Sequence, residues 1–485
     1  MIAPAEMAIL DANAAALGIP RKQLMESSGM AIAREVRSMV AESAPVTIVC
    51  GGGNNGGDGM VAARALQPER VTVAMVGEPE SIRTDITREN WRALERCELA
   101  VQTNADPESL DLDTAALVVD AMVGTGLTEP LREPARSMAI AIDEAEATVL
   151  SVDVPSGMGP GAAPDDGVMI DPDRIISFHD TKPGVESVGC PVTVADIGIP
   201  RAARRFVENG DLLRVARSPD SHKGDNGEVL VIGGGPYAGA PAFAGMAALR
   251  AGADLVRVAC PAVVASDVQG YSPSLIVEPL EGERLHSRHL ERLVDRARGH
   301  DSVVIGPGLG GAEESQHTVA AILERVEGTV VVDAEALLAV PERPTEARLV
   351  CTPHQGELVR MGGPASDDWR ERQELVAAFA AEIEQTTLVK GRYDVISDGT
   401  RSRVARRGTP AMTVGGTGDV LAGVVGALAA TLDPFEAACV GAYITGRAGE
   451  LAASGEGPVP ARGDGLMAAD VIATIPAAAQ PEAFR

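Results

Sequence analysis

An acidic residue, Asp419, ends the glycine-rich stretch TVGGTGD, directly before the apolar run VLAGVVGALAA. The first turn of a helix presents free backbone N–H groups and the positive end of the helix dipole, so it attracts anions. A carboxylate beside such an anion site can take the proton of a hydroxyl that attacks phosphorus. The stretch therefore indicates phosphoryl transfer, although an acidic residue at this position also simply stabilises a helix N-terminus.

A lysine, Lys390, ends the apolar segment TLVKG, where a cation needs a phosphate or an acid as its partner. We therefore interpret Lys390 as functional as well. His354 and Glu357 in TPHQGE can equally cap a loop. His222 and Lys223 in SHKGDNG can equally lie in a solvated turn.

The first half of the chain carries its own glycine-rich loop, GGGNNGGDG, at residues 51–59 after the apolar segment VTIVC. Its glycines match the spacing of a dinucleotide-binding fingerprint, a weak signal in a chain with 53 glycines. Asp58 would repel a pyrophosphate at that helix start. The oxygens of Asn54 and Asn55 suit a hard cation instead, which disfavours an ordinary NAD-dependent dehydrogenase.

Two further polar clusters follow apolar segments of the same half. Asp120 precedes residues 124–130 in VVDAMVGTGLTEP, and Asp153 precedes Ser156 in SVDVPSG. Each alone is explained by capping of a loop or helix. Together with Asn55 they offer oxygen ligands at three strand ends, which favours a binding site there.

These residues can form a site only if the fold brings the ends of several strands together, and the apolar pattern predicts such a fold. A helix is expected from Lys22 to Val40, and VTIVC, VTVAMV, ALVVDAMV and TVLSVDV read as short, continuously apolar strands. Such strands separated by helices are typical of a parallel sheet covered on both faces. In such α/β sheets, ligands bind at the carboxyl ends of the strands.

The polar segment 211–227 separates this pattern from a second one: EVLVIGG, ADLVRVAC, SVVIGPG, TVVVDAE, ARLVCTPH and TLVKG. We therefore expect two α/β domains, 1–212 and 213–485. The clusters GPGLG, DAEAL, TPHQGE and KGRYD end strands of the second domain, so we expect them to share one site.

Composition limits the function classes. The net charge of −27 disfavours nucleic acid and anionic membranes as partners. The absence of a long apolar run and of a basic leader predicts a cytoplasmic protein without a membrane span. The six dispersed cysteines predict buried free thiols. Only four bases are lysines, and an acidic, lysine-poor composition is typical of proteins that work in high salt.

The assembled motifs resemble the bifunctional NAD(P)H-hydrate repair enzymes along nearly the whole chain. They are NNGGDG, VVDAMVGTGL, VDVPSG and TKPG, then HKGDNGEVLVIGG, GPGLG, DAEAL, TPHQGE, LVKG and GGTGD, in that family's order. The resemblance implies a Rossmann-like three-layer epimerase domain followed by a ribokinase-like dehydratase domain. It also implies R and S epimers of NADH or NADPH hydrated at C6 as substrates, and ADP or ATP with Mg²⁺ as the phosphoryl donor.

Several residue roles are implied by the resemblance alone. The implied hydrate contacts of the first domain are Asn54, Asn55, Gly56, Gly57, Asp58, Gly124, Thr125, Gly126, Leu127, Thr128, Glu129, Pro130 and Asp153. The implied potassium ligands are Asn55, Asp120 and Ser156. In the second domain, the hydrate contacts are Ala253, Gly308, His354 and Asp419, and the nucleotide contacts are Lys390, Gly391, Arg392, Tyr393, Asp394 and Gly418. The segment KGRYD departs from the small-residue KGAxT common in the family.

The chemistry expected of these residues follows from the substrate. Asp419 takes the proton of the C6 hydroxyl as that hydroxyl attacks the terminal phosphate of ADP, and the GGTG amides stabilise the developing charge. Asp153 acts as the proton shuttle of the epimerase, with Lys182 of TKPG as its partner, since water loss and re-addition at C6 can use one acid–base group.

Two alternatives remain open from the sequence. The second domain can be a ribokinase-like kinase of a vitamin precursor. The first domain can be a non-catalytic module that binds NAD derivatives and regulates the second. We also expect a homo-oligomer.

Overall fold

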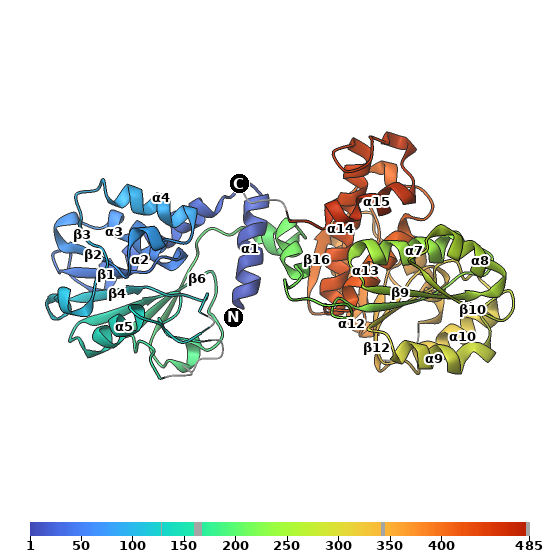
Figure 1. Ribbon diagram of the computed structural model, residues 1–485, viewed down its shortest axis with the longest axis horizontal. Coiled ribbons are helices and arrows are strands. Elements are labelled where there is room, and N and C mark those ends of the chain that lie inside the picture. Colours follow the sequence, from blue (N-terminus) through green and yellow to red (C-terminus); the bar gives the residue numbers. More distant parts are fainter. Residues whose placement is uncertain (128, 160–166, 341–344, 482–485) are drawn as a thin grey trace. The chain divides into compact units, whose positions relative to one another are not determined.

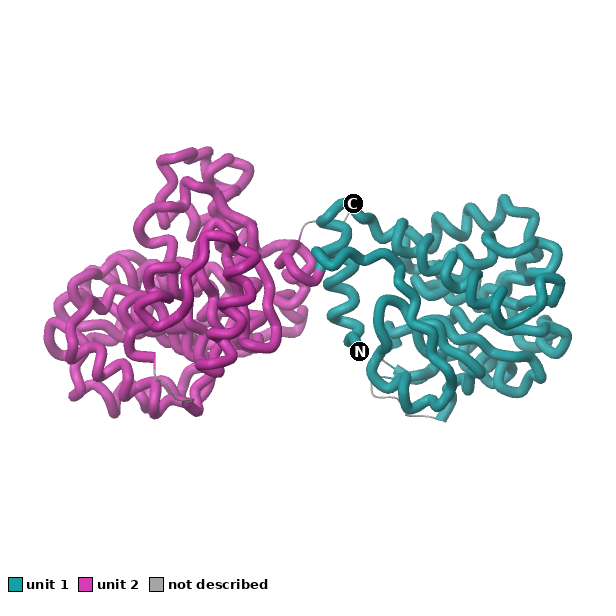
Figure 2. Tube along the Cα trace, turned by 180° about the vertical axis from the view of Figure 1, so that it is seen from behind, with its two compact units in different colours: residues 1–203 teal, residues 204–485 magenta. Residues whose placement is uncertain are grey.

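The computed structural model describes residues 1–127, 129–159, 167–340 and 345–481. The chain forms two compact units, Met1–Ala203 and Arg204–Arg485, drawn in separate colours in Figure 2. Strands and helices alternate in both units, which confirms the predicted α/β class. Among the described residues, none of the helices has the length and apolar character that a membrane span requires.

The division between the units falls at residue 203, inside the short helix α6 (Arg201–Arg205), whereas the sequence placed it after residue 212. The intervening residues pack on the last strand of the second unit. Phe206 pairs with Val404, Arg406 Nη2 lies 2.6 Å from Glu208 Oε1, and Arg403 is ion-paired with Asp211. These contacts join residues far apart in the chain, so sequence pattern did not reveal them.

The sheet of the first unit is parallel throughout, in the order β3-β2-β1-β4-β5-β6-β7. Its strands are β1 (Val46–Cys50), β2 (Val71–Met75), β3 (Ala100–Gln102), β4 (Leu117–Ala121), β5 (Thr148–Val152), β6 (Arg174–Phe178) and β7 (Val192–Ala195). The order reverses at β1, so helices must cover both faces, and the crevice at the reversal is the expected ligand site.

Helices cover both faces of this sheet (Figure 1). The helices over the sheet are α2 (Arg21–Met39), α3 (Asn54–Ala65), α4 (Asp85–Leu94) and α5 (Ala135–Glu144), and α1 (Pro4–Ala16) packs against α2. The helix predicted from Lys22 to Val40 is thus confirmed as α2. Alternate residues of β1 face opposite sides: Ile48 joins the core under α2 and α3, and Val49 joins the core under α5. A strand buried on both faces has to be apolar throughout, as VTIVC is.

The second unit has a nine-stranded mixed sheet in the order β10-β9-β8-β11-β12-β13-β14-β15-β16. Its strands are β8 (Glu228–Ile232), β9 (Leu255–Pro261), β10 (Ile276–Leu280), β11 (Ser302–Ile305), β12 (Gly328–Val332), β13 (Ala347–Cys351), β14 (Thr386–Val389), β15 (Asp394–Ser397) and β16 (Ser402–Ala405). The strands run parallel up to β14, and β15 and β16 add an antiparallel edge. The carboxyl ends of β8 and β11–β14 therefore meet at one edge.

Helices again cover both faces (Figure 1). They are α7 (Gly239–Ala251), α8 (Ala262–Tyr271), α9 (Leu290–Arg298), α10 (Glu313–Leu323), α11 (Gln355–Arg360), α12 (Trp369–Ile383), α13 (Thr417–Ala429), α14 (Pro434–Ser454) and α15 (Ala468–Ala478). One core joins the sheet to α7, α13, α14 and α15, and another joins it to α9 and α10.

Helix α13, which carries Asp419, lies deep in the first of these cores, with every residue from Val420 to Ala429 buried. Its glycines allow this depth. A Cβ on Gly423 would lie 2.1 Å from the Ala244 carbonyl oxygen of α7, and one on Gly426 would lie 2.3 Å from Val304 of β11. The sequence VLAGVVGALAA therefore positions the start of α13 rigidly at the strand-end edge. The six cysteines are free thiols, as predicted, but only four of them are buried, because Cys97 and Cys190 are partly exposed.

Candidate functional site

The first unit contains a cavity of about 890 Å³ at the carboxyl ends of its strands. The lining includes most residues that the sequence predicted there: Asn54, Asn55, Asp58, Gly124, Thr125, Gly126, Leu127, Glu129, Pro130, Asp153 and Lys182. Thr128, also predicted, lies outside the described residues. Segments from three separate strand ends thus meet at one cavity, as parallel topology requires.

Two predicted contacts, Gly56 and Gly57, do not line the cavity. Both are buried in the first turn of α3, where a Cβ on Gly56 would lie 1.8 Å from the Gly51 carbonyl oxygen. A Cβ on Gly57 would lie 2.8 Å from Met25 of α2. These glycines let α3 pack against the β1 loop and α2, which gives them a structural role in NNGGDG, and their contact with the hydrate stays a prediction.

Asp153 and Lys182 form the central ion pair of this cavity. Asp153 follows β5 with φ at +66°, a left-handed backbone that is rare for aspartate and occurs at strained functional positions. Lys182 Nζ lies 2.5 Å from Asp153 Oδ1 and donates to the Phe178 carbonyl at 2.7 Å and the Asp180 carbonyl at 3.1 Å. Lys182 is 2% exposed, so this ammonium group is held in place by acceptors on all sides.

The carboxylate of Asp153 is fixed through one oxygen. The Ser177 hydroxyl and the Phe178 N–H also approach Oδ1, at 3.4 and 3.3 Å. Among the described residues, no hydrogen bond ends on Oδ2. That oxygen remains for a ligand in the cavity that Asp153 lines.

The predicted cation ligands lie beside the same cavity. Asp120 is buried at the end of β4 and accepts from Ser156 Oγ at 2.5 Å, from Ser156 N at 2.8 Å and from Ser151 Oγ at 2.9 Å. Burial raises the pKa of Asp120, and these hydrogen bonds oppose the rise. Asn55 Oδ1 would lie 3.1 Å from a Cβ on Gly124, in the loop after β4.

Four charged residues of the lining were not predicted: Arg83, Arg132, Asp11 and Arg21. Asp11 and Arg21 lie on α1 and α2, away from every strand end. The signal in the sequence was a lone acid in the apolar stretch MAILDANAAALG. Burial raises the pKa of Asp11 to about 6, and Asp153 raises it further, while Arg21 and Lys182 oppose the rise. Burial also raises the pKa of Asp58 well above its usual value, with Asp153 and Asp11 adding to the effect.

In the second unit, the predicted residues Gly308, His354 and Lys390 follow β11, β13 and β14 at one edge of the sheet. His354 and Lys390 are directly adjacent, since they form a β-bridge and Lys390 N donates to the Pro353 carbonyl at 2.9 Å. His354 also caps α11, because its Nδ1 accepts from Gly356 N at 2.9 Å. His354 therefore both caps α11 and lies next to Lys390 in the site.

Lys390 is the centre of this second site. Its Nζ lies 2.8 Å from Asp333 Oδ1 and 3.8 Å from Glu357 Oε2, and a Cβ on Gly418 would lie 3.4 Å from it. Burial lowers the pKa of Lys390, but Asp333, Glu357 and Asp419 outweigh burial and raise it. Lys390 thus stays charged next to the first turn of α13. Asp333, in the motif DAEAL, was not assigned a role from the sequence.

Asp419 lies in the first turn of α13, as the sequence predicted. Gly416 begins this turn with φ at +96°, and a Cβ there would lie 2.9 Å from Phe243, so the turn requires glycine. Burial raises the pKa of Asp419 to about 7, and the Asp333 carboxylate adds to the rise while Lys390 opposes it. A carboxylate poised near neutrality can serve as a general base at physiological pH.

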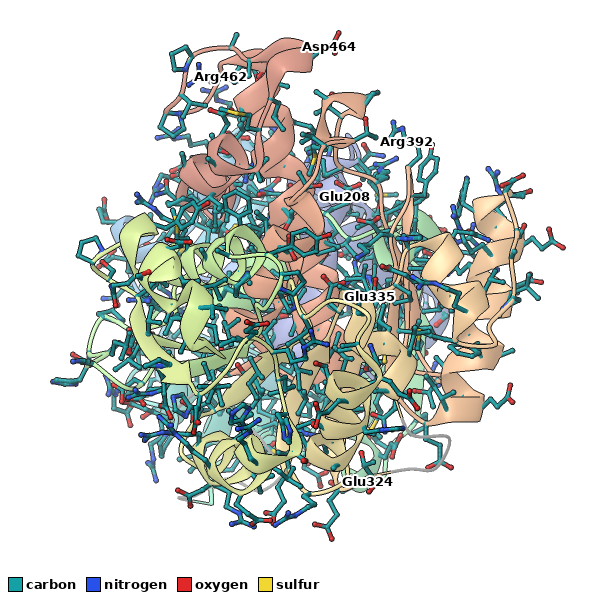
Figure 3. The ribbon with its side chains drawn as sticks, turned by 90° about the vertical axis from the view of Figure 1, so that its right-hand side faces the viewer. Glu208, Glu324, Glu335, Arg392, Arg462 and Asp464 are labelled. Atoms are coloured by element: carbon teal, nitrogen blue, oxygen red, sulfur yellow. The ribbon has the colours of Figure 1, made fainter. Side chains whose placement is uncertain are left out.

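The remaining nucleotide contacts predicted from KGRYD lie in the turn between β14 and β15. Gly391 N donates to Asp394 Oδ1 at 2.8 Å, and burial raises the pKa of Asp394 to about 7. Arg392 is exposed, stacks over the Tyr393 ring at 5.2 Å and donates to the Arg406 carbonyl. In Figure 3, Arg392 lies toward the periphery of the view, with Glu335 of the DAEAL motif nearer its centre.

The structure contradicts one prediction in this unit. Ala253 precedes β9, so it lies at the amino-terminal edge of the sheet, opposite Gly308 and Asp419, and it is buried in the core. It cannot share their site. The residue that does lie beside Gly308 is Ala240 in the first turn of α7, whose Cβ would be 3.1 Å from a Cβ on Gly308. Ala253 precedes its strand in ADLVRVAC, whereas the other predicted contacts follow theirs.

Comparisons with known proteins match the two units to two different families. A family model described as YjeF-related protein N-terminus matches residues 21–184, and one described as NAD(P)H-hydrate dehydratase matches residues 229–466. The bifunctional NAD(P)H-hydrate repair enzyme of Methanothermobacter thermautotrophicus is 39% identical over 99% of this chain and 95% of its own length. That of Methanospirillum hungatei is 41% identical over 98% of this chain and 93% of its own.

A similar solved structure is that of the ADP/ATP-dependent NAD(P)H-hydrate dehydratase from Bacillus subtilis, co-crystallised with ATP and Mg²⁺. It is 25% identical, covers 56% of this chain and 97% of its own, and has a TM-score of 0.48.

Proposed function

Because this chain belongs to the family of bifunctional NAD(P)H-hydrate repair enzymes, we propose that its first unit interconverts the R and S hydrates of NADH and NADPH and that its second unit dehydrates the S hydrate with ADP. The observation that carries the proposal is that each unit has its own acid–base centre. In the first, Asp153 forms an ion pair with Lys182, and in the second, Asp419 and Lys390 each shift the pKa of the other. Similarity along nearly the whole chain disfavours a vitamin-precursor kinase with an unrelated first domain.

In the second unit, Asp419 accepts the proton of the C6 hydroxyl while the hydroxyl oxygen forms a bond to the terminal phosphorus of ADP. The bond from that phosphorus to AMP breaks, and the charge on the phosphoryl oxygens is stabilised by Lys390 and the first-turn amides of α13. The ring nitrogen lone pair then expels phosphate from C6. Loss of a C5 proton restores the reduced nicotinamide.

Mg²⁺ would enter this site with the nucleotide. Among the described residues, no cluster of three histidine, cysteine or acidic side chains could hold a metal ion. Mg²⁺ is commonly held by substrate phosphates, water and one or two carboxylates, and the carboxylates of Asp333, Glu357 and Asp419 all act on Lys390 at this site. The metal would neutralise charge on the phosphates.

In the first unit, the chain's own residues fit a monovalent cation. Asp120 and Ser156 share hydrogen bonds, and the buried amide Nδ2 of Asn55 has no partner within the part of the chain that the structure describes. Exchanging the two amide atoms of Asn55 would turn an oxygen to that position. We propose that Asn55, Asp120 and Ser156 hold K⁺, which would supply positive charge beside the loop at Gly124.

The test uses the whole protein with each pure hydrate and ADP, followed by the return of the absorbance of reduced nicotinamide. Asp419→Asn should abolish recovery from both hydrates, and Asp153→Asn should abolish recovery from the R hydrate alone. The matched control for the first variant is Asp464→Asn, an exposed aspartate at the far end of the second unit in Figure 3. Near-normal recovery from the S hydrate with Asp419→Asn would refute the assignment.

Parallel reactions with ADP and ATP would identify the donor. A cytoplasmic location, adaptation to high salt and a homo-oligomeric state remain predictions from the sequence.

A further inference from the structure

Asp11 enters the first cavity from α1, an element that carries none of the family motifs. The helix is held in place by the buried residues Ile9, Leu10 and Ala12, and by Asn13, whose Nδ2 donates to the Ala203 carbonyl at 3.2 Å. Asp11 lines the cavity together with Asp153 and Lys182. A fixed helix thus presents a carboxylate to the same space as the central ion pair.

One oxygen of the Asp11 carboxylate has no structural partner in the part of the chain that the structure describes. This atom, Oδ1, is buried and has no hydrogen-bond partner among the described residues. A buried acceptor without a partner destabilises the fold, so its presence calls for another explanation, such as a bound ligand. This sets Asp11 apart from Asp120, whose oxygens accept several hydrogen bonds.

The charges around Asp11 come from several elements. Arg21 of α2 and Lys182 after β6 lower its pKa, Asp153 after β5 raises it, and Asp58 of α3 is coupled to it. Burial outweighs the cations and brings the pKa of Asp11 to about 6. A carboxyl with this pKa exchanges its proton readily near neutral pH.

The proposed epimerisation needs two proton transfers, one on each face of the nicotinamide ring, and a single fixed group reaches only one face. The ring nitrogen lone pair expels the C6 hydroxyl, which must receive a proton to leave as water. A water molecule then adds to C6 from the opposite face and must lose a proton, while the electron pair returns to nitrogen. Two acid–base groups that reach opposite faces of the ring complete both transfers without turning the substrate.

We propose that Asp11 is the second proton-transfer residue of the epimerase, acting on the face of the nicotinamide ring opposite the Asp153–Lys182 pair. This inference rests on the proposed epimerase function. In one direction Asp11 takes the proton of the adding water while the pair protonates the departing hydroxyl, and in the other direction the roles exchange. The active enzyme therefore carries one mobile proton on the two groups together.

The test measures conversion of pure R hydrate to S hydrate by the whole protein without nucleotide, with the epimers separated by chromatography. Asp11→Asn keeps the side-chain shape and removes the carboxylate. Its matched control is Asp111→Asn, which changes an exposed aspartate of the same unit that makes no side-chain cap. Recovery of reduced nicotinamide from S hydrate and ADP reports the second unit separately.

We expect Asp11→Asn to slow the R-to-S conversion by about 10²-fold or more, within the range for loss of a general acid or base. Recovery from the S hydrate should not change, and Asp111→Asn should behave as wild type. The kcat/KM of wild-type epimerisation should fall as the pH drops through about 6, because protonated Asp11 cannot accept a proton. Asp11→Asn should lack this decline.

A conversion rate within threefold of wild type, or an unchanged decline near pH 6 in Asp11→Asn, would overturn the proposal. If Asp11→Asn lowers the Tm, the pH profile of the wild-type protein decides, and a flat profile between pH 5 and 7 refutes the role of Asp11. A wild-type protein that cannot convert R hydrate at all would instead refute the epimerase function.

Discussion

The two sites use the same residue types and different degrees of enclosure. Each places one of the chain's four lysines against an aspartate at a strand end, Lys182 with Asp153 and Lys390 with Asp333. The side chain of Lys182 is 2% exposed and that of Lys390 is 20% exposed. The remaining lysines, Lys22 and Lys223, are exposed.

Enclosure decides what each lysine can do. The ammonium of Lys182 contacts Asp153 and donates to carbonyls of its own loop. It therefore has the role of positioning the Asp153 carboxylate and stabilising its negative charge. Lys390 keeps one side open beside Gly418 and the first turn of α13, where an anion is favoured. A lysine–aspartate pair therefore serves proton transfer in one unit and phosphate binding in the other.

The largest difference between the two sites is expected when their lysines are replaced, and the larger loss of stability is expected at Lys182. Lys182→Met leaves Asp153, whose side chain is 14% exposed, charged and without its partner. We therefore expect the first unit to lose about 3 kcal/mol of unfolding free energy and R-to-S conversion to fail. Urea unfolding and the epimer assay measure this. Lys22→Met, which removes an exposed lysine paired with Glu89, is the matched control. A fully stable Lys182→Met protein would show that the pair is not what holds Asp153.

The corresponding change in the second unit should act on catalysis. Lys390→Met removes a cation that faces the developing phosphoryl charge, so dehydration of the S hydrate should slow by about 10²–10³-fold. Conversion of R to S hydrate should stay at the wild-type rate, since that reaction belongs to the first unit. Equal loss of both reactions would contradict the separation of the two sites.

The two sites should also differ in pH dependence. The base Asp419 must be ionised, and its pKa is raised to about 7, so kcat/KM for dehydration should fall about tenfold per pH unit below 7 and level off above it. Profiles with S hydrate and ADP between pH 5 and 9 measure this. A profile that is level down to pH 5 would mean that another group takes the hydroxyl proton.

The smallest effect is expected at Gly418. Its added Cβ would meet Lys390 Nζ at 3.4 Å, an ordinary contact, and Gly418 has helical backbone in α13. Gly418→Ala should therefore raise stability by about 0.4–1 kcal/mol and change the KM for ADP only slightly. Thermal unfolding and initial rates test this. A tenfold rise in KM would show that the nucleotide needs the space above Gly418.

Much of both sites was predictable because parallel α/β topology gathers strand ends. Once VTIVC, ALVVDAMV and TVLSVDV read as strands, the residues after them had to meet at one edge, and Asn55, Asp120 and Asp153 do. The same reasoning placed Gly308, His354 and Lys390 together. It failed for Ala253, since a motif that begins before a strand lies at the other edge.

The sequence by itself determined the α/β class, the two-domain order and the chemistry-bearing motifs, because hydrophobic period and turn residues are local properties. Only the tertiary structure decided which glycines permit close packing, since a Cβ on Gly56 would lie 1.8 Å from the Gly51 carbonyl oxygen. It also placed Asp11 of α1 in the site of the first unit and Asp333 of DAEAL in the site of the second unit. Burial and long-range charge select these residues, and both depend on how distant segments pack.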